Sequence, residues 1–497
     1  MLTLALILEA LSREHLDLIG KGGRPSDQQS EAILGLLQRP VAGAIVDSRQ
    51  AYKDTLFVAL PGERVDGHDY IVDAFQRGSR LALIQNPPTA RLPFVDLRGG
   101  ISEENLWLAL REHDPEGAIC LLVDDSLKGL QTIARFWRRK LNIRVIGITG
   151  SVGKSTTKEI IADVMSQRYR TLKSLGNLNN EIGLPLTLLR LNEAYECAVL
   201  EMGFYVPGEI AFLCDIAQPQ VGVVTLIGPV HAERAGSIEE IAKGKAELVQ
   251  SLPAAPEGVA VLNYDDPWVR WMAGLTHARV FYYGLTDKAN LWADNIEGLG
   301  LEGIRFQIHY RKESLNLRVP LIGQHSVQTV LRAVAVGLVE GLTWQEIVNG
   351  LRSERTQLRL MTGYAQNGAL ILDDTYNASP ESMLAALNLL DELDGRKIAV
   401  LGDMLELGQY EKEGHETIGA RAAEVVNLLV TVGERSKMID YSAWQAGLSR
   451  KYISHFSTTD EVVDYLKEIL TPDDVVLIKG SRGMEMERIV SALEASE

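Results

Sequence analysis

A short glycine loop carries the residues whose types and spacing most clearly suggest chemistry. An apolar run over 145–149 leads into Gly150-Ser-Val-Gly153, and a helical pattern then opens with Lys154-Ser-Thr156. A strand, a glycine loop and a helix in this order can bind an anion, because backbone N–H groups point into the loop and the helix start carries about +0.5 of an elementary charge. Phosphate fits such a site. Lys154 is suited to the β and γ phosphates and the Ser155 hydroxyl to Mg²⁺.

The loop is shorter than the strict P-loop pattern. That pattern requires a glycine at position 148, where this chain has Ile148. Only Gly150-x-x-Gly153-Lys-Ser matches, so a plain strand-to-helix turn is the alternative to a nucleotide site. The apolar run before the loop and the helical pattern after it favour the nucleotide site.

Composition predicts a soluble, multidomain protein that acts on small molecules. The chain has 497 residues, 46% of them hydrophobic and 23% charged, a length typical of about three domains. A net charge of −16 without a basic cluster in the sequence argues against a nucleic-acid partner. Cys120, Cys197 and Cys214 form no Cys-x-x-Cys pair, which predicts reduced thiols and a cytoplasmic protein. No membrane span is expected, and Met1–Leu8 is predicted to be an amphipathic helix instead of a signal peptide.

Three blocks of apolar runs and helical patterns predict three α/β domains that position the loop, over 1–140, 141–355 and 356–497. The first block contains a strand-like run at 55–60 and a basic helical stretch at 136–140, while 85–122 is left unassigned. The middle block has strand-like runs at 145–149, 197–201, 221–227 and 258–262 and ends in a helical pattern over 323–352. Helical segments separate the first three of these runs, which predicts a parallel sheet.

The third block predicts a Rossmann-like, doubly wound sheet. Its strand-like runs are 369–373, 398–402, 427–432 and 474–479, and its helices begin near 380, 412, 436 and 459. Ligands of such sheets bind at the carboxyl ends of the strands. Ser379 before Pro380 is typical of a helix N-cap, so Asp374, Tyr376 and Asn377 are expected on the loop between a strand end and a helix start. Glu201 likewise ends an apolar run, as a metal-binding carboxylate can.

Several strings resemble the Mur ligase family and its folylpolyglutamate synthetase relatives along most of the chain. Beside the glycine loop, these strings are Asn177-Leu-Asn-Asn-Glu-Ile-Gly-Leu-Pro185, Glu201-Met-Gly203, Ile227-Gly-Pro-Val-His231, Ile241-Ala-Lys-Gly-Lys-Ala-Glu247, Asp374-Thr-Tyr-Asn-Ala-Ser-Pro380, Leu401-Gly-Asp-Met-Leu-Glu-Leu-Gly408 and Lys479-Gly-Ser-Arg482. In the first block, Asp47-Ser-Arg49, Leu56-Phe-Val-Ala-Leu60 and Asp66-Gly-His68 resemble the family's UDP-binding domain.

The resemblance implies an ATP- and Mg²⁺-dependent amide ligase of cytoplasmic cell-wall precursor synthesis. A central P-loop ATPase domain would lie between an N-terminal UDP-binding α/β domain and the C-terminal Rossmann-like domain. The strings at 374–380 and 401–408 are similar to members that join UDP-N-acetylmuramoyl-tripeptide to D-alanyl-D-alanine through an acyl phosphate. The Asp-Asn-Pro-Arg string usual in the member that adds the third amino acid does not occur in the sequence. A monomer is expected.

Site residues are also implied by the resemblance. The implied catalytic residues are Lys154, Glu201, His231, Lys245 and Asp374. The implied Mg²⁺ ligands are Ser155, Glu201, His231 and Lys245, the last as a carbamate. The implied ATP contacts are Gly150, Ser151, Gly153, Lys154, Ser155, Thr156, His325, Ser326, Arg359, Asp374 and Asn377. The implied substrate contacts are Ser48, Arg49, Asn179, Asn180, Tyr376, Asn377, Ser379, Lys479 and Arg482.

One string departs from the family, and some alternatives stay open. Gly323-Gln-His-Ser-Val-Gln-Thr329 stands where the family has Gly-x-His-Asn-x-x-Asn, so the contacts to adenine are left open. Lys243 competes with Lys245 for the modified position, and Lys245 could instead be an ordinary ammonium paired with a phosphate or with Glu247. For the whole chain, the alternatives are a related ligase with a different amino-acid acceptor, a P-loop phosphotransferase, or a nucleotide sensor without catalysis.

Overall fold

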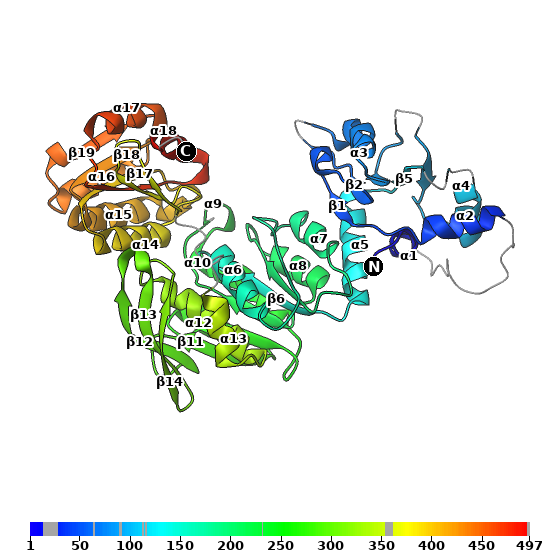
Figure 1. The fold of residues 1–497 in the computed structure, drawn as a ribbon, viewed down its shortest axis with the longest axis horizontal. Coiled ribbons are helices and arrows are strands. Elements are labelled where there is room, and N and C mark those ends of the chain that lie inside the picture. Colours follow the sequence, from blue (N-terminus) through cyan, green and yellow to red (C-terminus); the bar gives the residue numbers. More distant parts are fainter. Residues whose placement is uncertain are drawn as a thin grey trace. The chain divides into compact units, whose positions relative to one another are not determined.

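Parallel strands alternate with helices along the chain, as the sequence predicts (Figure 1). The structure is a computed structural model that describes residues 1–12, 28–62, 65–88, 92–111, 114, 117–230, 232–352 and 361–494. It divides into two units. The first comprises Met1–Val145, Tyr169–Met202 and Ala211–Pro219, and the second comprises Ile146–Arg168, Gly203–Ile210 and Gln220–Glu497. Within the described residues, no helix is both long and apolar enough to cross a membrane.

A five-stranded parallel sheet forms the centre of the first unit, with strand order β1-β2-β3-β5-β4. Its elements are α1 (Leu4–Leu11), α2 (Gln28–Leu37), β1 (Gly43–Ile45), β2 (Thr55–Val58), α3 (Ile71–Gln76), β3 (Leu81–Ile84), β4 (Phe94–Asp96), α4 (Glu103–Arg111), β5 (Ile119–Leu122) and α5 (Ser126–Lys140). The predicted helix at the start is therefore α1, and the basic stretch is the end of α5. Segment 85–122, unassigned from sequence, contains β4, α4 and β5.

The chain returns to the first unit after the glycine loop. There β7 (Thr171–Lys173) pairs in parallel with β8 (Cys197–Glu201), and α7 (Gly183–Leu188) connects them. Helix α8 (Glu209–Ala217) follows β8. β8 coincides with the predicted run 197–201, so Glu201 is its last residue.

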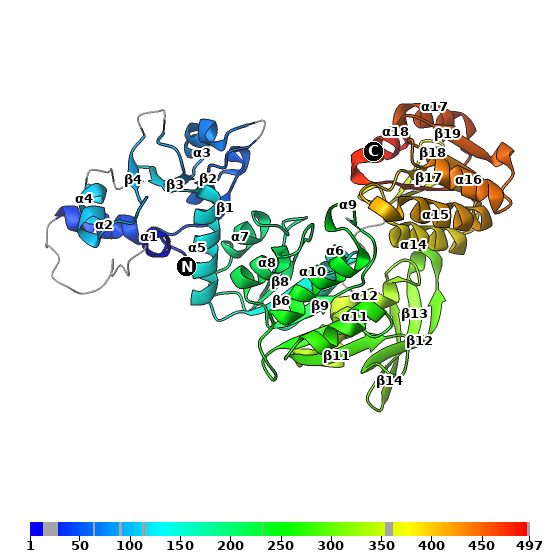
Figure 2. The same ribbon diagram turned by 180° about the vertical axis from the view of Figure 1, so that it is seen from behind.

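The second unit begins with a central lobe, residues 146–168, 203–210 and 220–352, built on a mixed sheet (Figure 2). Strand order is β14-β13-β12-β11-β10-β9-β6. The elements are β6 (Arg144–Thr149), α6 (Lys154–Met165), β9 (Val221–Val224), α9 (Ala232–Ala235), α10 (Ile238–Gln250), β10 (Val259–Asn263), α11 (Pro267–Trp271), β11 (Arg279–Gly284), β12 (Leu291–Gly298), β13 (Ile304–Tyr310), β14 (Glu313–Val319), α12 (Ser326–Val339) and α13 (Trp344–Leu351). Helix α12 packs beside α6.

The prediction of a parallel sheet for this block is correct only for part of it. Strands β6, β9, β10, β11 and β12 pair in parallel, whereas β13 pairs antiparallel with both β12 and β14. Two residues, Arg311 and Lys312, join β13 to β14, and so short a connection can only reverse the chain. The turn was not recognised in the sequence because it lacks the glycine that usually supplies positive φ, and Arg311 takes φ +56° itself.

The C-terminal lobe, residues 361–494, is the predicted doubly wound sheet with order β15-β16-β20-β17-β18-β19. Its elements are β15 (Met361–Tyr364), β16 (Leu370–Asp373), α14 (Pro380–Glu392), β17 (Arg396–Gly402), α15 (Glu411–Val425), β18 (Leu428–Val432), α16 (Lys437–Gln445), β19 (Ile453–Phe456), α17 (Thr459–Ile469), β20 (Asp474–Lys479) and α18 (Glu487–Leu493). Strand β15, an antiparallel edge strand, strand β19 and helix α18 were not predicted.

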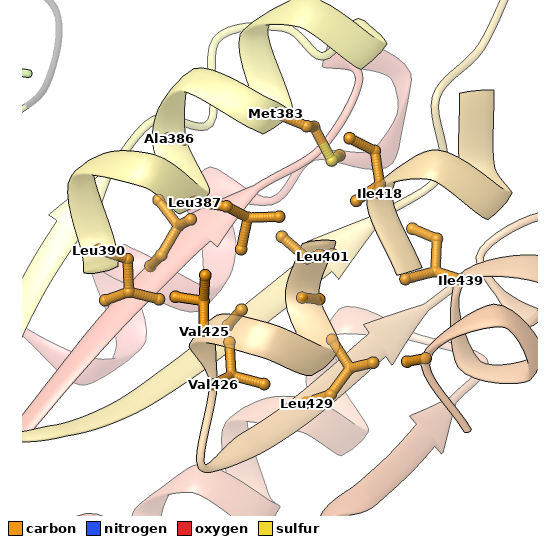
Figure 3. Packing of buried hydrophobic residues seen from close by; sticks show 14 of the residues in the cluster. Met383, Ala386, Leu387, Leu390, Leu401, Ile418, Val425, Val426, Leu429 and Ile439 are labelled. Atoms are coloured by element: carbon orange, nitrogen blue, oxygen red, sulfur yellow. The ribbon is translucent and has the colours of Figure 1, made fainter. Parts of the chain in front are cut away.

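Helices cover both faces of this C-terminal sheet (Figure 1). Alternate strand residues point to opposite sides, so Leu401 and Leu429 pack against α14, α15 and α16 while Val400 and Val430 pack against α17 and α18. Figure 3 shows the first of these cores, where Met383 and Leu387 of α14 meet Leu401. Burial on both faces explains why the strands are continuous apolar runs in the sequence.

A buried histidine fixes the turn that follows β17. The Met404 N–H donates to Nε2 of His415 at 3.1 Å, and Nδ1 of His415 lies 2.7 Å from the Glu411 carbonyl oxygen. Nε2 must therefore accept, and Nδ1 carries the proton of a neutral ring. Burial lowers the pKa of His415, because the charged ring would lose its hydration and its bond to Met404.

We expect His415→Ala to lower the free energy of unfolding of the C-terminal lobe by about 2 kcal/mol, because the buried Met404 N–H loses its acceptor. The unfolded chain takes up a proton at about pH 6.5, which the folded ring resists, so wild-type stability should fall as pH drops below that value. The variant should lose less stability than wild type between pH 7 and pH 5 in thermal unfolding. His277→Gln, at an exposed position, is the matched control. An identical pH dependence in His415→Ala and wild type would contradict this account.

Candidate active site

The glycine loop adopts a shape that only glycine permits at two positions. Gly150 has φ +142°, and a β-carbon there would lie 1.8 Å from Oγ1 of Thr225. Gly153 has φ +80° and precedes the first residue of α6, Lys154. The collision with Thr225 excludes a larger residue at 150, and the positive φ at 153 disfavours one there. The predicted strand, loop and helix are therefore present, with the loop N–H groups at the start of α6.

The segment after β9 holds this loop in place. The Ser151 hydroxyl donates to the Gly228 carbonyl and accepts from the Gly228 N–H, both at 2.9 Å. The Thr225 hydroxyl donates to the Val152 carbonyl at 2.7 Å. Ser151, predicted to contact ATP, thus uses its side chain to anchor the loop, and its nucleotide contact stays a prediction.

Two lysines donate to one carbonyl of the loop. Nζ of Lys154 lies 2.9 Å from the Gly150 oxygen, and Nζ of Lys245, on α10, lies 3.1 Å from the same oxygen. Lys245 is 1% exposed, and its ammonium lies 4.8 Å from the ring centre of Phe204. Gly244 permits this approach, since a β-carbon there would collide with the Phe204 ring. Burial first, and then the charge of Lys154, lowers the pKa of Lys245 well below its ordinary value.

Lys243 differs from Lys245 in every one of these respects. It is exposed, and its Nζ pairs with Glu240 at 2.7 Å. Of the two lysines in the string 241–247, Lys245 is thus the one buried against the glycine loop.

In the first unit, Glu201 is a buried carboxylate oriented by an amide. It is 2% exposed, and its Oε1 accepts from Nδ2 of Asn179 at 3.0 Å. The Oδ1 of the neighbouring Asn180 accepts from the N–H of Gly183, the first residue of α7, at 2.9 Å. Asn179 therefore positions Glu201, and the predicted substrate contacts of both asparagines stay predictions.

Ser48 and Arg49 lie in one short turn of the first unit, in different surroundings. Ser48 is buried and its hydroxyl bonds to Asp73, which lowers the pKa of that carboxyl. The exposed Arg49 pairs with Asp47 at 2.7 Å. Of these two side chains, Arg49 is the one that is charged and exposed, as a contact to an anionic substrate requires.

Lys479 fixes the loop that follows β16. Its Nζ lies 2.7 Å from Oδ2 of Asp374 and 2.8 Å from the Asn377 carbonyl oxygen. Lys479 is 2% exposed, whereas the Asp374 side chain is 24% exposed. The ammonium predicted to contact substrate therefore holds the loop that carries Asp374 and Asn377, and a direct contact to substrate stays a prediction.

The exposed part of this loop carries Tyr376, and Arg482 lies over its ring at 5.6 Å. Ser379 is buried and caps α14 by accepting from the Ser382 N–H at 3.3 Å, with Pro380 in the first turn, as predicted. The cap fixes the chain direction so that 374–377 lies at the carboxyl edge of the sheet.

The string 401–408 lies at the same edge as Lys479 and Arg482. The Ser481 N–H donates to the Asp403 carbonyl at 3.0 Å, and the Leu405 N–H donates to the Ser481 hydroxyl at 2.8 Å. From this string the C-terminal lobe also reaches the central lobe, because the Glu233 N–H donates to the Glu406 carbonyl at 3.2 Å. Asp403 and Ser481 were not singled out in the sequence, although both lie in the strings that carry the resemblance.

The string 323–329, which departs from the family pattern, lies at the start of α12. The Ser326 hydroxyl donates to the Ile322 carbonyl at 2.7 Å. The His325 ring keeps contact with solvent, yet protein atoms that limit its hydration, together with the charges of Arg332 and Lys479, hold the pKa of the imidazole below its ordinary value. The charges that act on His325 therefore come from both the central and the C-terminal lobe.

Two predicted site residues, His231 and Arg359, lie outside the described residues. Among the residues that are described, no group of three or more His, Cys, Asp or Glu side chains is gathered as a metal site. Sequence reasoning missed Arg332, a buried cation beside the loop. The available signal was its charge in the middle of the apolar helix pattern over 323–352.

Comparison with known proteins finds models of one family in all three parts of the chain. The Mur ligase middle domain matches residues 148–337, the Mur ligase glutamate ligase domain matches 355–482, and the Mur ligase family catalytic domain matches 41–107. The chain is 34% identical over 474 residues to the UDP-N-acetylmuramoyl-tripeptide–D-alanyl-D-alanine ligase of Bacillus subtilis, which covers 93% of this chain and 97% of the relative.

Two solved structures share the fold and part of the sequence. A crystal structure of MurF from Acinetobacter baumannii superposes with a TM-score of 0.76 at 29% identity, covering 90% of this chain and 92% of that one. The MurF ligase from Thermotoga maritima in complex with ADP gives a TM-score of 0.72 at 26% identity, covering 91% and 97%.

We expect Lys479→Met to release the 374–377 loop, because Asp374 and the Asn377 carbonyl lose their common donor. Hydrogen exchange of the amides at 374–378 should become faster, and the free energy of unfolding should fall by about 2 kcal/mol, since the pair is only partly shielded from water. Arg488→Met, which removes the exposed pair with Asp460, is the control and should change neither. Unchanged exchange in Lys479→Met would show that the loop does not depend on this ammonium.

Proposed function

Since the chain belongs to the Mur ligase family, we propose that it is the ATP-dependent amide ligase that joins D-alanyl-D-alanine to UDP-N-acetylmuramoyl-tripeptide in peptidoglycan precursor synthesis. The observation that carries the proposal is the convergence of Lys154 and Lys245 on the Gly150 carbonyl of the glycine loop. Lysine side chains beside a glycine loop at a helix start suit the negative charge of a polyphosphate. The named relatives support the choice of the two substrates.

The reaction joins a carboxylate to an amine, and neither reacts unaided. A carboxylate oxygen of the tripeptide forms a bond to the γ-phosphorus, the bond to the bridging oxygen breaks, and ADP leaves. The amine of D-alanyl-D-alanine then attacks the acyl phosphate, loses a proton, and inorganic phosphate leaves as the amide forms. The protein contributes positioning and charge neutralisation to both steps.

The nucleotide site is proposed at the glycine loop, with Gly150, Ser151, Gly153, Lys154, Ser155 and Thr156 against the phosphates. The Thermotoga maritima relative is described in complex with ADP, which supports the proposal of a nucleotide site in this chain. His325 and Ser326, at the start of α12, are proposed to lie near the base, and Arg359 near the phosphates. The loop N–H groups and the two lysines match the charge of a polyphosphate.

Oxygen donors in this chain fit Mg²⁺. The Glu201 carboxylate is buried and oriented by Asn179, and Ser155 offers a hydroxyl at the loop, as hard cations prefer. We propose these two residues and His231 as ligands. Bound Mg²⁺ would neutralise phosphate charge and polarise the γ-phosphoryl group. The Glu201 carboxylate would supply negative charge and Ser155 a hydroxyl oxygen to hold the cation.

Lys245 is proposed to carry a carbamate. Only a neutral amine adds CO₂, with loss of one proton, and burial beside Lys154 favours that neutral form. The carbamate would turn a repulsion between two ammonium groups into an attraction. An ordinary ammonium, as bonded to Gly150, is the competing state.

The remaining parts of the proposal concern the outer domains. In the C-terminal domain, Asp374, Tyr376, Asn377 and the Ser379 cap are proposed to face the incoming amine and the nucleotide, with Arg482 close to Tyr376. In the N-terminal domain, the exposed Arg49 beside Ser48 is proposed to bind the UDP portion. Boundaries at 140/141 and 355/356, a monomeric state and a cytoplasmic location complete the proposal.

A ligase with a different acceptor is the nearest alternative. Purified protein with ATP, Mg²⁺ and UDP-N-acetylmuramoyl-tripeptide should release phosphate only when D-alanyl-D-alanine is added, and mass spectrometry should find the joined product. Lys154→Ala should lower the rate at least about 100-fold, because it removes a charge aimed at the phosphates. Lys243→Ala, on the exposed side of α10, should behave like wild type. Turnover with a single amino acid and none with the dipeptide would overturn the assigned acceptor.

Lys245→Ala tests the carbamate. We expect it to lose activity and to regain part of it with added acetate, because a small carboxylate can occupy the space of the missing group. Wild-type protein in bicarbonate enriched with ¹³C should give a carbamate carbon signal in NMR, and Lys245→Ala should lack it. Full activity of Lys245→Ala, or an absent signal in active wild-type protein, would refute the modification.

A further inference from the structure

Arg332 is a buried cation beneath the phosphate loop that the proposed chemistry leaves unused. It lies in the middle of α12 and is 4% exposed, between the fully buried Leu331 and Ala333. Its Nη1 lies 3.3 Å from the point that a β-carbon on Gly153 would occupy. Removing a guanidinium from water is costly unless other groups compensate, so its partners matter.

The partners of Arg332 are neutral hydroxyl groups. Nε donates to the Tyr283 hydroxyl at 2.9 Å, and Nη1 donates to Oγ1 of Thr157 at 2.5 Å and to Oγ1 of Thr329 at 3.4 Å. No carboxylate of the described residues forms an ion pair with this guanidinium. The hydroxyls orient it, and its positive charge lies beside a loop built for anions.

The same hydrogen bonds connect Arg332 to both sides of the loop. Thr157 belongs to the first turn of α6, directly after the loop. Tyr283 is fully buried and donates to the Thr225 carbonyl at 3.1 Å, and the Thr225 hydroxyl donates to the Val152 carbonyl at 2.7 Å. One chain of bonds therefore runs from Arg332 to the helix start, and another runs to the middle of the loop.

Arg332 also occupies the neighbourhood of the departing string. Thr329, which stands where the family string has its second asparagine, accepts from Arg332. His325 precedes Arg332 by seven residues, or about two helical turns. The charge of Arg332 helps to lower the pKa of His325. A full positive charge therefore lies beside the string that departs from the family.

We propose that Arg332 is a positioning residue whose charge prepares the loop for a polyphosphate, so that it strengthens nucleotide binding in proportion to the nucleotide's negative charge. This inference rests on the proposed ATP site. A role in binding differs from a role in packing. A guanidinium that only held α12 against α6 would change the affinity for charged and uncharged ligands alike.

The test compares dissociation constants of ATP, ADP, AMP and adenosine, measured by calorimetry with Mg²⁺ on the full chain. In Arg332→Met we expect ATP and ADP to bind about tenfold or more weakly, AMP less so, and adenosine to change less than about twofold. Arg332→Lys keeps the charge and should bind ATP within about threefold of wild type. Arg305→Met removes an equally charged but exposed side chain of the same lobe and should leave all four ligands unaffected.

Equal weakening of ATP and adenosine, or unchanged ATP binding, in Arg332→Met would overturn the inference. Melting temperatures identify a variant that fails to fold. In that case Arg332→Lys decides: near-wild-type ATP binding supports the role of charge, and parallel loss of ATP and adenosine refutes it. A wild-type chain that binds none of the phosphorylated ligands would overturn the proposed function itself, and this inference with it.

Discussion

One carbonyl oxygen, that of Gly150, receives the ammonium groups of both Lys154 and Lys245, and most of the site follows from this arrangement. Charges on both ammonium groups would repel each other, and burial disfavours the charge of Lys245. The loop itself is held by other bonds, from Ser151 to Gly228 and from Thr225 to Val152. An anion at the loop would favour the charged form of Lys245, so phosphate binding and the charge of Lys245 are expected to influence each other.

The C-terminal lobe solves a different problem, which is to hold a loop that follows the end of a strand. It uses one buried ammonium, Lys479, to bind both the Asp374 carboxylate and the Asn377 carbonyl. Ser481, two residues later, bonds to the backbone of the 401–408 string, so β16, β17 and β20 present their ends as one surface. The exposed Tyr376 is carried on this fixed base. Mobility in this region is thus expected of the whole surface, not of single residues.

Much of the fold could be predicted because its strands are apolar runs between helical patterns. In the C-terminal lobe each such run lies on a sheet covered on both faces, so burial and sequence correspond directly. The β13–β14 hairpin escaped prediction because Arg311 makes a turn that sequence rules assign to glycine. In the site, motifs identified which residues belong together but not their partners. That Lys479 is buried under Asp374, that Asn179 orients Glu201, and that Arg332 lies beneath Gly153 depend on packing between segments far apart in the chain.

Strand β14 ends the strand order of the central lobe among the described residues, so one of its sides has no neighbouring strand there. Such an edge can recruit a second chain through its free backbone groups. Ser314, Asn316 and Arg318 are exposed along it, while Leu317 and Val319, on the opposite face, are buried. These polar side chains and the Arg318 charge would have to be desolvated before another strand could pair. The polar half of this alternation therefore discourages aggregation, a property that matters most while the chain is still being synthesised and its partners are not yet folded.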